Sequence, residues 1–208
     1  PLTVIGDVSI ADGCVLGTVT TPWTNDISLG SLTIASGGTF SAPSGNTTLH
    51  LEDGSGNSWF NSGTFTHNNG KVVIDNDGDC NVRGTGFYDL EINMDGTTDD
   101  CDWYSPAAST LIVYNDFTIS RGKFRIAAAG DSIIVHGNTH VAANGKFNDN
   151  DAATGTHTFH GVVTTASSDF STTSGTNNFN GGIRQLGTLV SNDTLTIGGT
   201  GGILEGNL

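Results

Sequence analysis

Short alternations of apolar and polar residues run along most of the chain. Leu32 and Ile34 flank a single polar residue, and Phe117 and Ile119 do the same further along. A period of two is the pattern of a strand that buries one face. Glycine, asparagine, aspartate and serine interrupt these alternations every few residues, which predicts sharp turns between short strands. Because no helical periodicity of useful length is present, the sequence predicts an all-β protein.

The alternation recurs as a repeat. The segments Leu111–Phe124, Ile133–Phe147 and Thr158–Phe170 align with one another, and Leu2–Leu16 and Ile27–Phe40 have the same design. One aligned column holds Val113, Val135, Phe159 and Phe179. A second column holds Phe124, Phe147, Phe170 and Leu189. The phenylalanines of this second column are evenly spaced along the chain, as expected if each copy forms one coil of a stack.

One such copy cannot bury its own apolar face, so successive copies must stack about 4.8 Å apart. We therefore predict a single parallel β-helix, or β-solenoid, of roughly nine short coils over residues 1–208. An antiparallel β-sandwich is the alternative, because it also suits short strands punctuated by glycine. The even spacing of the phenylalanines favours the solenoid. The chain begins at Pro1 and not at Met, which suggests a processed product or a fragment of a longer chain.

Composition and charge narrow the function. The chain has 30 glycines in 208 residues, 35% hydrophobic residues and 13% charged residues, unlike a charge-rich disordered tail or a helical bundle. Its 21 acidic and 7 basic residues give a net charge of -14, which would repel nucleic acid phosphates and anionic membranes. No apolar stretch approaches the roughly 20 residues that a membrane span requires. We therefore expect no nucleic acid partner and no membrane insertion.

Several motifs carry a family resemblance: Gly84–Ile92 (GTGFYDLEI), Gly155–Gly161 (GTHTFHG) and Gly175–Ile183 (GTNNFNGGI). They resemble the β-solenoid repeats of large bacterial surface adhesins and of bacteriophage tail or decoration proteins, and the resemblance covers most of the chain. It implies a non-catalytic structural or adhesive role at a virion or bacterial cell surface, outside the cytoplasm. It transfers no active-site residues.

The segment Asp95–Ser109 breaks the repeat and is predicted to protrude as a loop. It carries Asp102, Trp103 and Tyr104. Binding residues concentrate on loops that a rigid scaffold holds, and aromatic rings beside carboxylates suit the C–H faces and hydroxyl groups of sugars. The other two tryptophans, Trp23 and Trp59, also lie in polar segments and are predicted to lie outside the core columns. The alternative is that these aromatic residues cover the flank of the rod or fill a subunit interface.

Three of the seven basic residues alternate along one predicted strand. Arg121, Lys123 and Arg125 alternate with the apolar Phe124 and Ile126, so they share an outward face. On so acidic a protein, this face is a candidate dock for an acidic neighbour or a glycan. The alternative is that these charges protect a strand edge and keep the protein soluble.

The densest acidic group is a candidate calcium site. Asp75, Asp77 and Asp79 alternate with other polar residues, and alternate carboxylates can converge with backbone carbonyls on a hard cation. The group departs from an EF-hand loop, because Cys80 stands where glycine is expected and no closing glutamate follows. The alternative is a polar turn between coils. No other cofactor is expected to be required.

The spacing of two cysteines suggests that they lie on neighbouring coils. The separation of Cys80 and Cys101 along the chain is close to one coil, so they are predicted to lie near enough for a disulfide, with buried free thiols as the alternative. Cys14 occupies a core-like position in its copy and is predicted to be a small buried residue.

Two histidines follow the first column. His136 and His160 come directly after aligned core residues, so they are predicted to stack as outward neighbours. Stacked imidazoles can bind zinc or copper. The alternative is a solvated ladder without a metal.

A carbohydrate-cleaving β-helix is the second functional hypothesis, because polysaccharide lyases and hydrolases on this fold use carboxylate pairs. Glutamate is scarce, and no Gly-x-Ser-x-Gly nucleophile motif is present. If the chain cleaves glycans, the candidate residues are Arg83, Asp99, Asp100 and Asp102.

The last segment, Thr194–Leu208, is strand-like and has no evident polar cap. An uncovered terminal coil presents unpaired strand edges to other chains. We therefore predict that this end stacks on another subunit or on a continuation of the chain.

Overall fold

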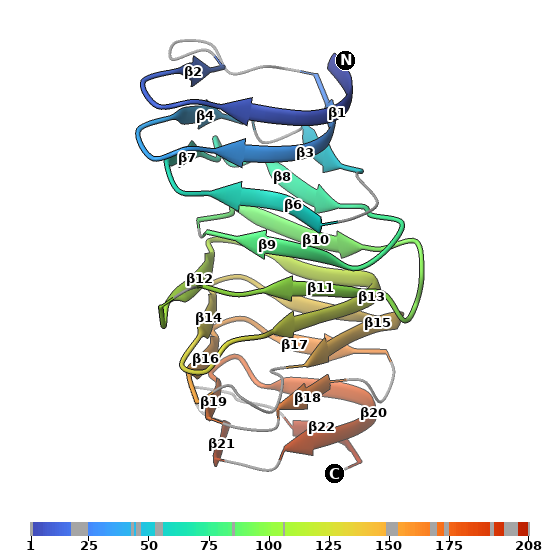
Figure 1. Cartoon of the computed structure of the whole chain (residues 1–208). Coiled ribbons are helices and arrows are strands. Elements are labelled where there is room, and N and C mark those ends of the chain that lie inside the picture. The colour runs from blue at the N-terminus through green and yellow to red at the C-terminus, as the bar shows by residue number, and fades with distance from the viewer. Residues whose placement is uncertain are drawn as a thin grey trace.

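The computed structural model is all-β and describes most of the chain. It describes residues 2–17, 25–42, 44, 47–52, 56–84, 86–105, 107–148, 154–166, 170–172, 175–191, 194–197 and 204–207. No helix is assigned within these ranges. The strands lie one below another in successive turns from the N-terminal to the C-terminal end (Figure 1).

The strands form one large sheet and two small ones. The first half of the large sheet contains β1 (Leu2–Ile10), β3 (Ile27–Ile34), β5 (Thr48–Leu51), β6 (Gly56–Asn61), β8 (Lys71–Ile74), β9 (Cys80–Arg83) and β10 (Asp89–Asn93). Its second half contains β11 (Asp100–Trp103), β13 (Phe117–Ile126), β15 (Thr139–Asn148), β17 (Val163–Thr165), β18 (Phe170–Thr172), β20 (Ile183–Ser191) and β22 (Leu204–Asn207). A five-stranded sheet contains β12 (Thr110–Val113), β14 (Ser132–Val135), β16 (Thr156–Phe159), β19 (Thr176–Phe179) and β21 (Thr194–Ile197). A three-stranded sheet contains β2 (Val15–Leu16), β4 (Thr39–Ser41) and β7 (Thr64–Thr66).

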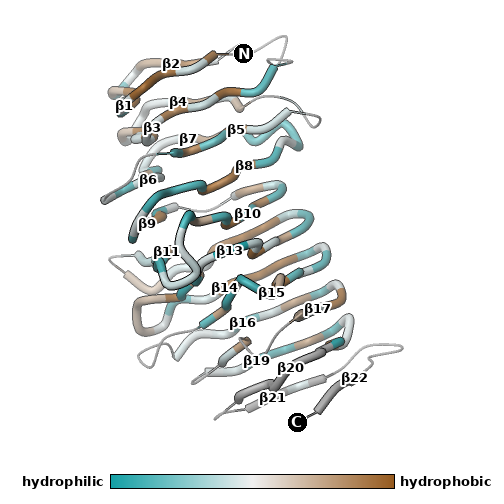
Figure 2. Tube along the Cα trace, turned by 90° about the vertical axis from the view of Figure 1, so that its right-hand side faces the viewer, coloured by the Kyte–Doolittle hydropathy of each residue, from teal (hydrophilic) through white to brown (hydrophobic). Residues whose placement is uncertain are grey.

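Most turns pass along the large sheet and then through a smaller one, and the turn that follows β9 contributes only the bridge of Phe87 to Val113 among its described residues. Some turns cross the large sheet as one long strand, whereas others use two shorter ones: β10 and β11 both pair with β13. All the pairings between described strands are parallel. The fold is therefore the predicted parallel β-solenoid and not the antiparallel sandwich. Hydrophobic and hydrophilic stretches alternate along the stacked turns between β3 and β17 (Figure 2).

Both predicted columns are confirmed. In the first, Val113, Val135, Phe159 and Phe179 are register partners on successive turns. In the second, Phe124, Phe147, Phe170 and Leu189 are register partners. The two columns meet inside the solenoid, because Phe147 packs edge-on against Phe159 with ring centroids 5.8 Å apart. The phenylalanines of both columns are at most 1% exposed, so each contributes about 1.5–3 kcal/mol through burial.

Glycines allow adjacent turns to approach closely at one corner. Gly137, Gly161 and Gly181 follow the five-stranded sheet on successive turns. A Cβ atom on Gly161 would overlap the carbonyl oxygen of Gly137, and one on Gly181 would overlap the carbonyl oxygen of Gly161. Since no side chain fits against the backbone of the preceding turn, this corner requires glycine.

Residues 95–109 do not form the single protruding loop that the broken repeat suggested. Residues Asp100–Trp103 form β11, which pairs with β9 and β13 inside the large sheet. The described segments on either side of β11 lie outside the strands, and they lengthen this coil. More of the chain separates Leu90 from its partner Phe117 than separates Phe124 from its partner Phe147. Because this interval is longer than the others, the alignment of the repeats did not reveal β11.

Cys14 is exposed, so the prediction that it is a buried core residue is wrong. It lies on the first described turn, where β1 and β2 pair with a described turn on one side only, through β3 and β4. Two other apolar residues of this turn are exposed for different reasons: Ile5, at 99%, lies in the register shift between Val4 and Asp7, and Val15, at 58%, shares an outward column with Thr39 and Thr64. Apolar alternation alone could not reveal that this turn lacks a second neighbour among the described strands.

Candidate functional site

Four charged residues meet on the outward face of β11 and β13. Alternation along β11 buries Cys101 and Trp103 and turns Asp100 and Asp102 outward. The register places Lys123 beside Asp100 and Arg125 beside Asp102 on the next turn. We call Asp100, Asp102, Lys123 and Arg125 the charged band.

Ion pairs hold the charged band together. Lys123 Nζ lies 2.8 Å from Asp100 Oδ1, and Arg125 Nη1 lies 2.8 Å from Asp100 Oδ2. Arg125 also donates through Nε and Nη2 to both carboxylate oxygens of Asp102 at 2.5 Å, which is a bidentate pair. The hydrogen bonds to Asp102 raise the pKa of Arg125 although burial opposes them. The band is therefore a neutralised surface.

These ion pairs affect the predicted basic face, which was a candidate surface for binding an acidic neighbour or a glycan. Lys123 and Arg125 are occupied by carboxylates of the preceding turn, so they do not present an open basic patch. Arg121 is exposed and lies at a register shift after Ile119, opposite Asn144. A binding role for these three residues stays a prediction.

A second outward group borders the charged band. The guanidinium carbon of Arg83 lies 4.8 Å from the ring centroid of Phe60 and 4.7 Å from that of Tyr104. Phe60 and Arg83 are register partners on adjacent turns, and Tyr104 directly follows β11 on the next turn. We call these three residues the arginine stack. Both rings attract the cation through their faces, which orders Tyr104 as part of the rod surface and not as the tip of a loop.

Trp59 and Trp103 are core residues, so their prediction as outward aromatic residues is wrong. Both are 0% exposed. Trp103 Nε1 donates to the carbonyl oxygen of Gly84 at 2.8 Å, and Trp59 packs against Phe65 with ring centroids 4.7 Å apart. Strand alternation places both indoles inside. Trp23 lies outside the described residues.

The acidic group at 75–79 does not converge on a common point. Across the described part of the chain, no three His, Cys, Asp or Glu side chains are placed to hold a metal ion. Asp75 accepts a hydrogen bond from Asn93, and Asp79 accepts one from the backbone N–H of Asp100 at 2.8 Å. Asp77 is exposed between them. These contacts connect neighbouring turns, as the polar-turn alternative expects.

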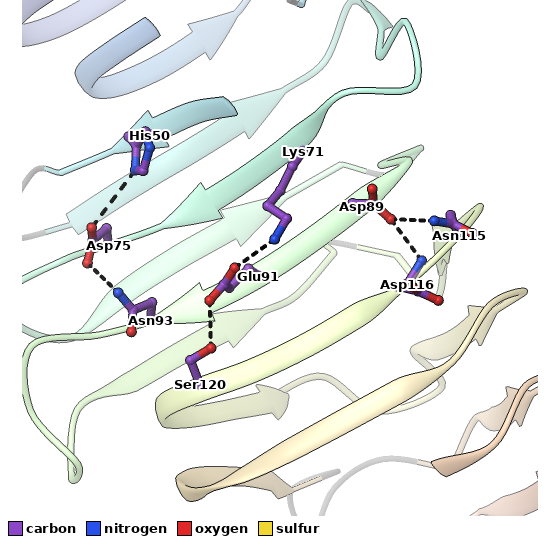
Figure 3. Close-up of polar contacts among 9 residues, drawn as sticks. All are labelled: His50, Lys71, Asp75, Asp89, Glu91, Asn93, Asn115, Asp116 and Ser120. Carbon is purple, nitrogen blue, oxygen red and sulfur yellow. Dashed lines mark hydrogen bonds and ion pairs between the residues drawn. The ribbon is translucent and has the colours of Figure 1, made fainter. Parts of the chain in front are cut away.

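Polar ladders also cross the large sheet around β8 and β10, where only Asp75 had been named as a candidate from the sequence (Figure 3). Glu91 accepts hydrogen bonds from Lys71 on the preceding turn at 3.0 Å and from Ser120 on the following turn at 2.6 Å. Burial alone would raise the pKa of Glu91, but these two hydrogen bonds and the Lys71 charge lower it below its ordinary value. The carboxylate thus joins three turns.

Two further carboxylates in Figure 3 also connect neighbouring turns. Asp75 lies 3.9 Å from His50 and accepts a hydrogen bond from Asn93. Burial raises the pKa of Asp75 despite these partners. On the same sheet, Asp89 accepts hydrogen bonds from Asn115 at 2.8 Å and from the backbone N–H of Asp116 at 3.0 Å. Only the register of successive turns, which a single sequence does not fix, brings such residues together.

Cys80 and Cys101 are register partners on adjacent turns, as predicted, and both are buried free thiols. They extend the second core column, because Cys101 pairs with Phe124 on the next turn. The Cys80 contact and burial raise the pKa of the Cys101 thiol. Cys101 therefore remains protonated at neutral pH.

The predicted histidine stack is confirmed, and it is part of a longer row of rings. The rings of His136 and His160 are parallel, with centroids 5.1 Å apart. Tyr114 stacks on His136 at 6.1 Å, and His67 lies 5.2 Å from Tyr114 and 5.4 Å from Tyr88. We call these five residues the corner ladder. The tyrosines were missed, although Tyr114 follows Val113 in the same aligned position as His136 after Val135.

No protein-family model, curated protein or solved structure matches this chain. None of the described residues belongs to a helix long and apolar enough to cross a membrane.

Proposed function

We propose that this chain is a non-catalytic structural or adhesive β-solenoid of a virion or bacterial cell surface. In this role it provides a rigid scaffold for assembly or attachment outside the cytoplasm. One observation carries the proposal: outward polar side chains are bonded to their neighbours on adjacent turns, as in the charged band and around Glu91. Such ladders stabilise a rod and fix the spacing of the groups that it displays.

We propose two kinds of partner: other subunits of the same assembly, which dock through the C-terminal coil, and surface glycans. Residues 198–203 and 208 of that coil lie outside the described residues. A surface with 21 acidic and 7 basic residues is unsuited to nucleic acid, and no membrane insertion is proposed.

The alternative is a carbohydrate-cleaving β-helix that uses Arg83, Asp99, Asp100 and Asp102. The contacts of these residues support it less well. Asp99 accepts a hydrogen bond from the backbone N–H of Gly96 at 2.7 Å, and the other two carboxylates are held by Lys123 and Arg125. Arg83 lies between two aromatic rings. A carboxylate pair that cleaves a glycoside must flank the bond and be open to substrate.

A glycan array followed by an assay of reducing ends and unsaturated products tests the proposal. The expected result is no release of oligosaccharide from any polysaccharide, including those that the chain binds. Turnover that disappears in the Asp100→Asn and Asp102→Asn variants would establish the alternative. Sedimentation over a range of concentrations tests the assembly partner, because a protein that stays monomeric at high concentration would contradict docking through the C-terminal coil.

A further inference from the structure

The small sheets are interrupted at one level of the solenoid, and a cavity lies at this interruption. The three-stranded sheet ends at β7, and the five-stranded sheet begins at β12. Between them, the intervening turn contributes only Phe87 among the described residues, through a single bridge to Val113. Figure 1 shows β7 and β12 on the same edge of the rod, separated by this level. The cavity has a volume of about 620 Å³ and is lined by Phe65, Thr66, His67, Asn68, Asn69, Gly86 and Tyr114.

The wall formed by residues 67–69 is held in one conformation. Asn68 and Asn69 have φ values of 50° and 58°, which asparagine tolerates better than most residues. Asn68 Nδ2 donates to Ser41 Oγ at 2.9 Å and to the Ala42 carbonyl oxygen at 2.8 Å. The backbone N–H of Gly70 donates to the His67 carbonyl oxygen at 2.8 Å, which closes the turn. A wall fixed in this way loses little conformational entropy of its own when a ligand binds.

The opposite wall is aromatic and accessible. Tyr114 is 47% exposed, and its ring lies 5.2 Å from that of His67. Gly86 places no side chain in front of Tyr114, and the nearest atom to a Cβ built on it is Tyr114 Cε2, at 4.0 Å. Burial lowers the pKa of His67, which keeps its ring uncharged at neutral pH. A ligand in the cavity therefore meets uncharged aromatic rings.

The lining selects the chemistry of the ligand. None of the described lining residues is Asp, Glu, Lys or Arg, although the chain has 21 acidic residues. A charged ligand would lose water without gaining a counter-charge, and a purely apolar ligand would cover the Asn and Thr groups without replacing their hydrogen bonds. The volume is within the range of about 300–1,000 Å³ that is typical of small-molecule pockets. These properties suit a molecule with both C–H faces and hydroxyl groups.

We propose that this cavity binds a short segment of a neutral saccharide, with a sugar face on Tyr114 and hydroxyl groups directed at Thr66 and Asn69. This inference rests on the proposed adhesive function, because it identifies the class of ligand that the adhesive scaffold binds. It places the glycan-binding site at the corner ladder and not at the segment around Tyr104.

Titration calorimetry with linear neutral hexaoses of glucose, mannose and galactose tests this proposal on the full chain. Tyr114→Ala should weaken binding of the best hexaose at least tenfold. Asn69→Gly should weaken it several-fold while retaining a backbone that favours positive φ. Tyr104→Ala is the matched control, because it removes a tyrosine from the arginine stack, and it should leave the affinity unchanged. An acidic hexaose of galacturonate should bind at least tenfold more weakly than the neutral one.

Two results would overturn the proposal: no binding of any neutral hexaose, or wild-type affinity in both Tyr114→Ala and Asn69→Gly. Circular dichroism of each variant checks folding, and Asn69→Gly keeps the test decisive if Tyr114→Ala is unstable. A failure here is distinct from a failure of the proposed function. The scaffold role is contradicted by turnover of a glycan and not by the absence of a ligand in this cavity.

Discussion

The guanidinium group of Arg125 lies against the carboxylate of Asp102, its register partner on the preceding turn, with Nε 2.5 Å from Oδ1. The two side chains are 25% and 22% exposed, so solvent screens them only in part. This bidentate pair therefore joins β11 to β13 in addition to the backbone hydrogen bonds between the two strands.

Arg125→Met should lower the free energy of unfolding by about 1 kcal/mol, because partly exposed bidentate pairs contribute at this level. Urea denaturation of Arg125→Met, Asp102→Asn and the double variant measures the coupling between the two side chains. The coupling should shrink in 1 M salt, where the Debye length falls to about 3 Å. Additive effects in the double variant would show that the pair contributes nothing.

Phe147→Ala should destabilise the protein by about 3–5 kcal/mol, the usual cost of removing a buried phenylalanine. The ring is 1% exposed and stacks on Phe170 with centroids 4.7 Å apart. Denaturation and hydrogen exchange together measure the effect, and exchange should accelerate most in β13, β15 and β18. The exposed Asn144→Ala substitution on the same strand is the control and should change stability by less than about 0.5 kcal/mol.

Gly161→Ala should destabilise the corner by about 1–3 kcal/mol, as overpacking of a filled site generally does. The added Cβ would overlap the backbone oxygen of Gly137, which cannot move aside as a flexible side chain can. The melting temperature checks this expectation. Ala143→Ser, at an exposed site on β15, should leave the melting temperature unchanged, and a neutral Gly161→Ala would show that adjacent turns are less closely spaced than described.

The three cysteines should react with a thiol reagent in two classes. Cys14 is exposed and should react quickly in the folded protein, whereas Cys80 and Cys101 are buried and should react only after unfolding. The raised pKa of Cys101 reduces its thiolate fraction and strengthens this protection. Cys14→Ser should abolish the rapid reaction. Rapid loss of all three thiols in the native state would contradict the buried positions.

Acidic pH should lower the free energy of unfolding, and His67 should account for part of this effect. Burial lowers the pKa of His67 in the folded state, so below about pH 6.5 the unfolded chain binds a proton there that the folded chain does not. The stability present above pH 6.5 is therefore lost as the pH falls toward the folded-state pKa. Comparison of wild type and His67→Gln by denaturation from pH 7 to pH 5 isolates this contribution. Equal pH slopes in the two proteins would contradict it.

The core was predictable where the repeat interval is regular. Phe124, Phe147 and Phe170 recur at a constant interval, and strand alternation then fixed which neighbours face inward. Upstream the interval varies, because Val72 is closer along the chain to its partner Leu90 than Leu90 is to its partner Phe117. Without a constant interval, the sequence predicts a loop where β11 lies, and it places the buried Trp103 on the surface.

Surface relationships were harder to predict, because they depend on register between turns as well as on alternation within one. The stack of His136 on His160 was found from the aligned column. The pairing of Asp102 with Arg125 was not found in this way, because the spacing of the two residues identifies them as partners only if β11 is known to be a strand. The cavity beside Tyr114 arises from an interrupted sheet, for which the sequence has no local signal.

The parallel register of successive turns has a further consequence. Within the second core column, Phe147 contacts the equivalent ring on the turn before it, Phe124, and on the turn after it, Phe170. An architecture of this kind is modular along its axis. A duplicate of residues 117–138 inserted after Asn138 would stack on the original copy on one side and on β15 on the other, so the rod could be lengthened by one turn with Phe124 stacked on Phe124. The new junction would place Arg125 opposite Arg125, so one arginine of the pair would need replacement by the aspartate that β11 supplies at Asp102.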